Sequence, residues 1–87
     1  MPPKPPYDWD ATKAASNLEK HGVPFEDVYR FDWAGAIEAE DTRYDYGEMR
    51  MQALGKIDDR YHVLVYAPRG DTIRVISLRK ANPRELK

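Results

Sequence analysis

The stretch YHVLVYAPRGDTIRVISLRK, residues 61–80, decides the fold of this chain. It contains two runs rich in β-branched and aromatic residues, YHVLVY and TIRVISL, with the turn-forming segment APRGD between them. Two such runs joined by a short segment that holds proline and glycine are typical of an antiparallel hairpin. A further period-two run begins at Glu48 and leads into the turn KIDDR, so residues 48–79 predict a three-stranded antiparallel meander.

A helix is expected before this meander. Asp10 is placed to cap its N-terminus, and the helix should run to about His21 and end at Gly22, because glycine readily adopts the left-handed conformation that ends helices. Helical spacing predicts a core-facing side made of Ala11, Ala14, Ala15 and Leu18. The same spacing places together, on another face of the helix, Lys13, Asn17 and Lys20.

The remaining elements are short. A second helix is expected at residues 24–30, because proline suits a first helical position, with a short strand at residues 7–9 and an edge strand at 34–40. Near the C-terminus, Asn82 followed three residues later by Glu85 predicts a capping box and the start of a short helix. Helices that precede antiparallel strands indicate an α+β fold, with N-terminal helices packed on an antiparallel sheet.

Size and composition limit what the chain can be. Its 87 residues predict one domain, at residues 7–87, after a proline-rich extension at residues 1–6. No apolar run approaches the roughly 20 residues that cross a bilayer, and MPPKPP lacks the features of a signal peptide. We therefore expect a cytoplasmic protein without membrane contact. The absence of cysteine excludes disulfides and thiolate catalysis.

Charge is distributed unevenly along the chain. The formal net charge is −1, but residues 69–87 carry six Lys or Arg against two acids, while residues 1–68 carry eight against thirteen. A local basic surface can bind phosphate even when the whole chain is nearly neutral, because salt screens charges beyond about 10 Å. A solvated surface of mixed charge is the alternative.

Three of these cations, Arg74, Arg79 and Lys80, lie on the last strand or at its end. Regular alternation predicts that one face carries Arg74, Ile76, Leu78 and Lys80, and the other Ile73, Val75, Ser77 and Arg79. The cations can serve in cross-strand ion pairs, for example between Arg74 and Glu48, or in phosphate contacts. The spacing of the residues leaves both purposes open.

The two histidines, His21 and His62, predict no metal site, because no carboxylate cluster at ligand spacing accompanies them. We expect no bound metal and no cofactor. His21 lies where a helix ends, so it can complement the negative end of the helix or act as the titratable group of a basic surface.

Four sequence motifs, in this order, resemble those of the BrnT family of ribonuclease toxins. The pattern W-D-x2-K-x3-N-x2-K-H-G-V-x-F begins at Trp9, and it is followed by DTRYDYGEMR, VYAPRG and RVISLRKA. Together they cover residues 7–81. The resemblance implies a RelE-like microbial ribonuclease fold and the toxin role in a type II toxin–antitoxin module. It also implies a BrnA-like ribbon-helix-helix antitoxin, through which alone the toxin would meet operator DNA.

The activity implied is metal-independent cleavage of RNA, which inhibits translation and growth. Such cleavage needs the 2′-hydroxyl deprotonated, the phosphorane stabilised and the leaving 5′-oxygen protonated. We expect Arg79 and Arg50 at the scissile phosphate and either Glu48 or His21 as the proton acceptor. The residues expected to bind RNA around them are Arg69, Lys80, Lys13, Lys20, Tyr46, Tyr66 and Arg74.

A different class of function fits the same basic surface. The chain can instead be a non-catalytic binding module, or a corepressor that acts only in complex with a DNA-binding partner. Growth arrest on induction, relieved by the neighbouring gene product, distinguishes the toxin from both.

Overall fold

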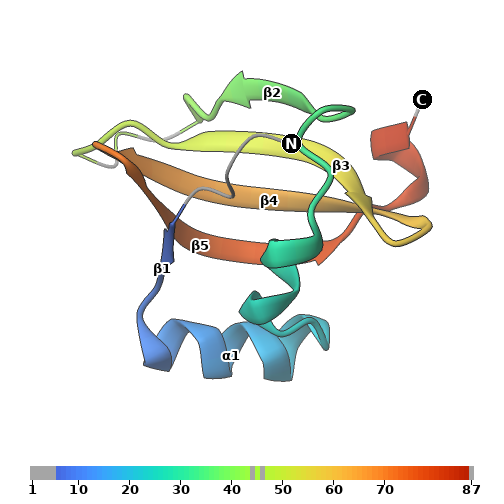
Figure 1. Cartoon of the computed structure of the whole chain (residues 1–87), viewed down its shortest axis with the longest axis horizontal. Helices are drawn as coiled ribbons and strands as arrows, with labels where there is room; N and C mark the ends of the chain where they lie inside the picture. Colours follow the sequence, from blue (N-terminus) through green and yellow to red (C-terminus); the bar gives the residue numbers. More distant parts are fainter. Residues whose placement is uncertain (1–5, 44, 46, 87) are drawn as a thin grey trace.

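The computed structural model describes residues 6–43, 45 and 47–86 (Figure 1). Its elements in chain order are β1 (Tyr7–Asp8), α1 (Ala11–His21), the 3-10 helix η1 (Phe25–Arg30), β2 (Ile37–Glu40), β3 (Met51–Ile57), β4 (Arg60–Arg69), β5 (Thr72–Lys80) and the 3-10 helix η2 (Pro83–Leu86). No helix in this described part of the chain is long and apolar enough to cross a membrane.

The strands form one five-stranded sheet in the order β1-β5-β4-β3-β2 (Figure 1). The expected meander is confirmed as β3, β4 and β5, and β2 adds an antiparallel edge strand. The expectation of a purely antiparallel sheet is wrong, because β1 pairs with β5 in parallel, Tyr7 opposite Ile73. The fold is therefore α+β with a mixed sheet.

Both hairpins of the meander are tighter than expected. The turns are limited to Asp58–Asp59 and Gly70–Asp71, and the first strand begins at Met51 rather than Glu48. Asp58 and Gly70 have positive φ values of 56° and 57°. Two-residue loops with positive φ match the right-handed twist of the flanking strands, which explains why pairing continues so close to each turn.

A β-bulge interrupts the alternation of the last strand. Val65 lies opposite Ser77 and Tyr66 opposite Val75, so Ile76 is the extra residue. Val75 and Leu78 are consequently both buried in the core, at 1% and 0% exposure, although regular alternation placed them on opposite faces. Their neighbours Arg74 and Arg79 therefore lie on the same face, away from the core. The prediction that these two arginines lie on opposite faces of the strand is wrong.

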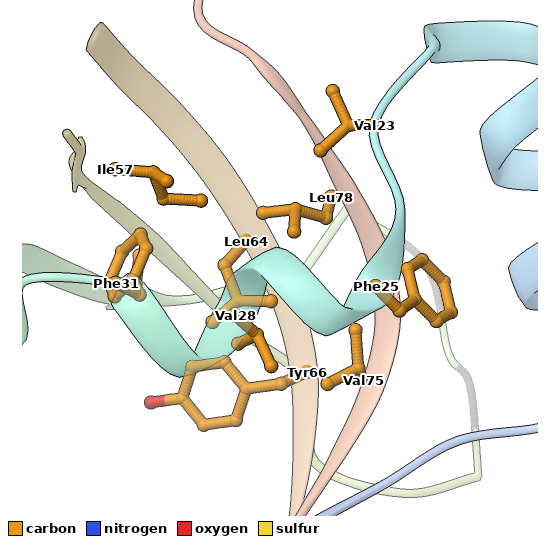
Figure 2. Packing of buried hydrophobic residues seen from close by; sticks show 10 residues of the cluster. Val23, Phe25, Val28, Phe31, Ile57, Leu64, Tyr66, Val75 and Leu78 are labelled. Atoms are coloured by element: carbon orange, nitrogen blue, oxygen red, sulfur yellow. The ribbon is translucent and has the colours of Figure 1, made fainter. Parts of the chain in front are cut away.

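The core lies between η1 and one face of the sheet. Figure 2 shows side chains of η1 and its flanks over those of the strands, and the buried cluster consists of Val23, Phe25, Val28, Phe31, Ala53, Ile57, Leu64, Tyr66, Val75 and Leu78. The short helix thus supplies more of the core than the longer α1 does. Burial of such side chains is the dominant stabilising term in a chain of this size.

Helix α1 packs against β5 through a face that shares only Ala14 with the expected one. Leu18 is 48% exposed, and Ala11 and Ala15 are exposed, whereas Asn17 is buried at 7%. The helix ends were predicted correctly, because Asp10 accepts a hydrogen bond from the Lys13 N–H at 3.0 Å and Gly22 is left-handed with φ 72°. Of the four residues predicted to face the core, Ala14 does pack against it, and the other three are exposed because the polar Asn17 occupies the contact with β5.

Asn17 bonds the backbone of β5 where β1 no longer covers it. Its Nδ2 donates to the Leu78 carbonyl at 2.8 Å and to the Val23 carbonyl at 3.0 Å, and its Oδ1 accepts from the Leu78 N–H at 3.2 Å. The amide therefore takes the place of a neighbouring strand and leaves these buried backbone groups satisfied.

We expect Asn17→Ala to lower the free energy of unfolding by about 2–3 kcal/mol, because it leaves buried backbone donors and acceptors without partners. Urea denaturation at neutral pH measures the loss. Ser16→Ala, at an exposed position of the same helix, is the matched control and should change stability by less than about 0.5 kcal/mol. Equal stability of the two variants would contradict this role.

Candidate functional site

A groove of about 320 Å3 opens between the end of α1, the loop after β2 and the sheet face that carries Arg79. Four cations from distant parts of the chain line it: Lys20, Arg43, Arg50 and Arg79. The remaining lining residues are His21, Asp41, Gln52, Val65, Ile76 and Ser77. Among the described lining residues the four cations outnumber the one carboxylate, Asp41, and although Glu85 pairs with Arg79 from outside the groove, the lining is suited to an anion.

Asp41 holds one of these cations. The Arg43 guanidinium donates to it from Nε at 2.9 Å and from Nη2 at 3.0 Å, and the Arg43 N–H adds a bond at 3.3 Å. The Asp41 side chain is 1% exposed and that of Arg43 65% exposed. A buried carboxylate thus fixes a largely exposed arginine at the mouth of the groove, and two parallel bonds give it a defined orientation.

Glu85 holds a second cation from η2. It accepts from Arg79 Nη1 at 2.7 Å and Nη2 at 2.8 Å, and the Asn82 N–H donates to it at 2.9 Å. The Glu85 N–H in turn donates to the Asn82 side chain at 3.1 Å, which confirms the predicted capping box, although the turn is 3-10 rather than α. Arg79 and the Asn82 N–H lower the pKa of Glu85 to about 2.

This pairing leaves Arg79 able to bind a further anion. A guanidinium has five N–H donors, and Glu85 uses one on each terminal nitrogen. Among the described residues, Nε has no hydrogen-bond acceptor, so Nε and the second N–H of Nη2 form a fork that fits phosphate oxygens. The pKa of Arg79 is raised, chiefly by Glu85, so its charge is permanent.

His21 lines the groove at the end of α1. Burial lowers the pKa of its imidazole, and the charges of Lys20 and Arg79 lower it further. The ring is therefore neutral at pH 7 and can accept a proton. It lies in the last turn of the helix, but a neutral ring carries no charge to complement the helix end, so of the two uses left open by the sequence the lowered pKa favours the titratable group.

Glu48 lies beside the groove, where it pairs with Arg69 at 3.2 Å and approaches Arg50 Nε at 3.8 Å. The pair of Glu48 with Arg74, given from the sequence as one example of cross-strand pairing, does not form. Arg74 Nη1 donates to Asp8 at 2.6 Å, because β1 lies next to β5 in a register that places Asp8 opposite Arg74. The cross-strand partner of Glu48 is the hairpin residue Arg69.

The expected RNA-binding residues separate into two groups. Lys20 lines the groove, and Lys13 lines an adjoining hollow of about 200 Å3 that shares Lys20 and His21 with it. Lys80 lines a different hollow, with His62, and neither Arg69 nor Arg74 lines the groove. The lysines of α1 therefore extend the cationic surface, while the other three residues lie elsewhere.

The structure tests only one of the two tyrosines that were expected to bind RNA. Tyr46 lies outside the described residues. Tyr66 is 6% exposed, its hydroxyl donates to Glu38, and its ring packs edge-on against Trp33 with centroids 5.4 Å apart. Burial and Glu38 raise its pKa. The expectation that Tyr66 binds RNA is wrong in this structure, because its ring belongs to the core.

Sequence reasoning missed Arg43, Asp41, Gln52 and Ser77 as groove residues. For Arg43 and Asp41 the one available signal was their place in the motif DTRYDYGEMR, from which no role was assigned to either residue. Gln52 and Ser77 line the groove because the strand register places both opposite Val65, on β3 and β5 respectively. Among the described residues, no three His, Asp or Glu side chains gather closely enough to hold a metal ion.

Comparison with known proteins gives one result. A family model described as "Ribonuclease toxin, BrnT, of type II toxin-antitoxin system" matches residues 9–85. No curated protein matches the chain. The match spans nearly all of the described residues and every residue of the groove.

We expect the Glu85–Arg79 pair to stabilise the fold by roughly 1 kcal/mol at neutral pH. The folded pKa of Glu85, about 2, lies below its ordinary 4.5, so the contribution is fully present above pH 4.5 and is lost as the pH falls through about 2. Urea unfolding of the wild type and Glu85→Gln should show a difference at pH 6 that shrinks at pH 3. An equal difference at both pH values would contradict the pairing.

Proposed function

We propose that this chain, which belongs to the BrnT family of ribonuclease toxins of type II toxin–antitoxin systems, cleaves RNA internally and without a metal ion in the groove beside α1. As such a toxin it has RNA as its substrate and an antitoxin as its protein partner. The observation that carries the proposal is the convergence of Lys20, Arg43, Arg50 and Arg79 with a neutral His21 in one groove.

The proposed reaction is an attack of the RNA 2′-hydroxyl on the adjacent phosphorus. The 2′-oxygen loses its proton, the phosphorane gains negative charge, and the bond to the 5′-oxygen breaks as that oxygen takes up a proton. The products are a 2′,3′-cyclic phosphate and a 5′-hydroxyl. Charge develops on the phosphate oxygens, so prearranged cations lower the barrier most.

Arg79 and Arg50 are proposed to contact the scissile phosphate. The bidentate hold of Glu85 on Arg79 supports this role, because it fixes the guanidinium before substrate arrives and avoids an ordering cost in the reaction. Arg43, held in the same way by Asp41, is proposed as a third contact. Lys20 and Lys13 would bind flanking phosphates along α1.

Of the two proton acceptors expected from the sequence, His21 is favoured. It lines the groove, and its lowered pKa keeps the imidazole neutral at pH 7. Glu48 instead pairs with Arg69 beside the groove, where its charge is neutralised. A neutral imidazole among cations can take up the 2′-hydroxyl proton without first releasing one of its own.

The metal-independent route is supported by what the groove contains. Its four cations supply the positive charge that a divalent ion would otherwise bring to the phosphorane, and they repel such an ion from the same space. The RelE-like kinship of the fold and a BrnA-like ribbon-helix-helix antitoxin are proposed on the motif resemblance alone. Action in the cytoplasm is proposed on the sequence, which has no apolar run that could cross a bilayer and no signal-peptide pattern at MPPKPP.

We expect Arg79→Ala and Arg50→Ala each to lower RNA cleavage about 10²- to 10³-fold, because each removes a donor to the developing charge. Cleavage of a defined RNA in the presence of EDTA measures the rate, and thermal melting verifies that the variants fold. Arg30→Ala is the matched control, since Arg30 pairs with Asp27 and Asp58 away from the groove. Full activity of folded Arg79→Ala, or no wild-type cleavage in EDTA, would overturn the proposal.

The pH dependence of the cleavage rate should follow the protonation of His21. Because the pKa of His21 is lowered from its ordinary 6.5, the acid limb of kcat/KM should lie at lower pH than a histidine with its ordinary pKa would give. His21→Gln should remove this acid limb and lower the rate about 10²- to 10⁴-fold. An unchanged pH profile in folded His21→Gln would exclude His21 as the acceptor.

A further inference from the structure

Strand β2 is a sheet edge with an open backbone. It lies last in the order β1-β5-β4-β3-β2, it pairs only with β3, and all four of its residues are exposed (Figure 1). No other described strand lies on its outer side. The opposite edge strand, β1, is only two residues long, and the Asn17 amide bonds the backbone of β5 at Leu78 beyond it, so that edge offers less open backbone. An edge strand with free N–H and C=O groups is a template for a further strand.

The side chains of β2 differ between its two faces. Glu38 accepts a hydrogen bond from the Tyr66 hydroxyl, which places it on the core side, and Glu40 shares that side by alternation. Ile37 and Ala39 lie on the other side, where they border a hollow with Leu54. One face of this edge is thus acidic and the other apolar.

The apolar side of β2 is exposed next to other apolar side chains. Ile37 is 72% exposed, and it lines a second hollow of about 340 Å3 whose other apolar members are Leu54, Tyr61 and Leu86. Leu86 itself is 51% exposed. Clustered exposed hydrophobic side chains mark a surface that another molecule covers.

The two glutamates of β2 favour a basic partner strand. Pairing of β2 with β2 of a second copy would bring four glutamates together across the new interface, which is unfavourable. Glu40 has no cationic partner among the described residues. A strand with Lys or Arg at alternate positions would neutralise Glu40, and its intervening apolar residues would cover Ile37.

We propose that β2 is the docking edge for the antitoxin, which adds a strand in which basic and apolar side chains alternate. This proposal rests on the proposed function, because it takes the partner to be the antitoxin of a toxin that acts in the groove. β2 leads directly into Asp41 and Arg43 of the groove, and Gln52 borders both the groove and the hollow beside Ile37. A chain bound along β2 would therefore reach the groove and can block it.

The test uses the purified toxin and the antitoxin encoded beside it. Ile37→Glu with Glu40→Lys should raise the Kd for the antitoxin at least about 10-fold in calorimetry, because central apolar and charged contacts dominate such interfaces. The matched control is Leu18→Glu with Glu19→Lys, the same chemical changes on the exposed side of α1. On wild-type toxin, antitoxin binding should protect amides of residues 37–40 from hydrogen exchange.

Each outcome decides the matter. Unchanged affinity of the folded double variant would overturn the proposal, and so would a lack of added protection at the amides of residues 37–40 or a toxin dimer joined through β2 in solution. If the double variant fails to fold, hydrogen exchange on the wild type decides alone. The free double variant should cleave RNA at the wild-type rate. If the wild type itself cleaves no RNA, the proposed function fails, while the binding and exchange results still decide the role of β2.

Discussion

The hydrogen bonds between the Asn17 side chain and the backbone of Leu78 fix the position of α1 on the sheet. Few apolar contacts could do this, since most of the apolar side chains of α1 face outward. The amide forms hydrogen bonds with both the N–H and the C=O of Leu78. It also donates to the carbonyl of Val23, which lies between α1 and η1. One side chain therefore joins the helix, the last strand and the segment that fills the core.

The geometry of the groove follows from that connection. His21 lies one helical turn beyond Asn17, and Arg79 is the residue after Leu78, so the contact that joins the helix to the strand also brings imidazole and guanidinium into one groove. The bulge at Ile76 acts at the same place, because it keeps both Val75 and Leu78 in the core. The sheet thus has a packed face beneath η1 and a polar face that carries the site.

Ion pairing and phosphate binding are compatible uses of the cations in this protein. Asp41 and Glu85 each hold an arginine through two bonds, and both arginines line the groove. Such pairs order long side chains in advance, so less conformational entropy is lost when an anion arrives. Their neutralising effect is partial, because Lys20 and Arg50 add further positive charge. Arg74 shows the contrast, since its partner Asp8 holds it outside the groove.

The sequence by itself determined the local structure: the caps of α1 at Asp10 and Gly22, the capping box at Asn82 and Glu85, and the order of helices before a meander, together with motifs that identified the family. These features depend on neighbours in the chain, where side-chain type and spacing suffice. Tertiary structure alone decided that Asn17 is buried, that Tyr66 belongs to the core, and that Arg43 enters the groove. It also decided that Arg74 pairs with Asp8 rather than Glu48. Each of these depends on strand register, on a bulge that breaks the period of two, or on contacts between residues distant in sequence, and the chemical type of a residue does not reveal which distant residue it will meet.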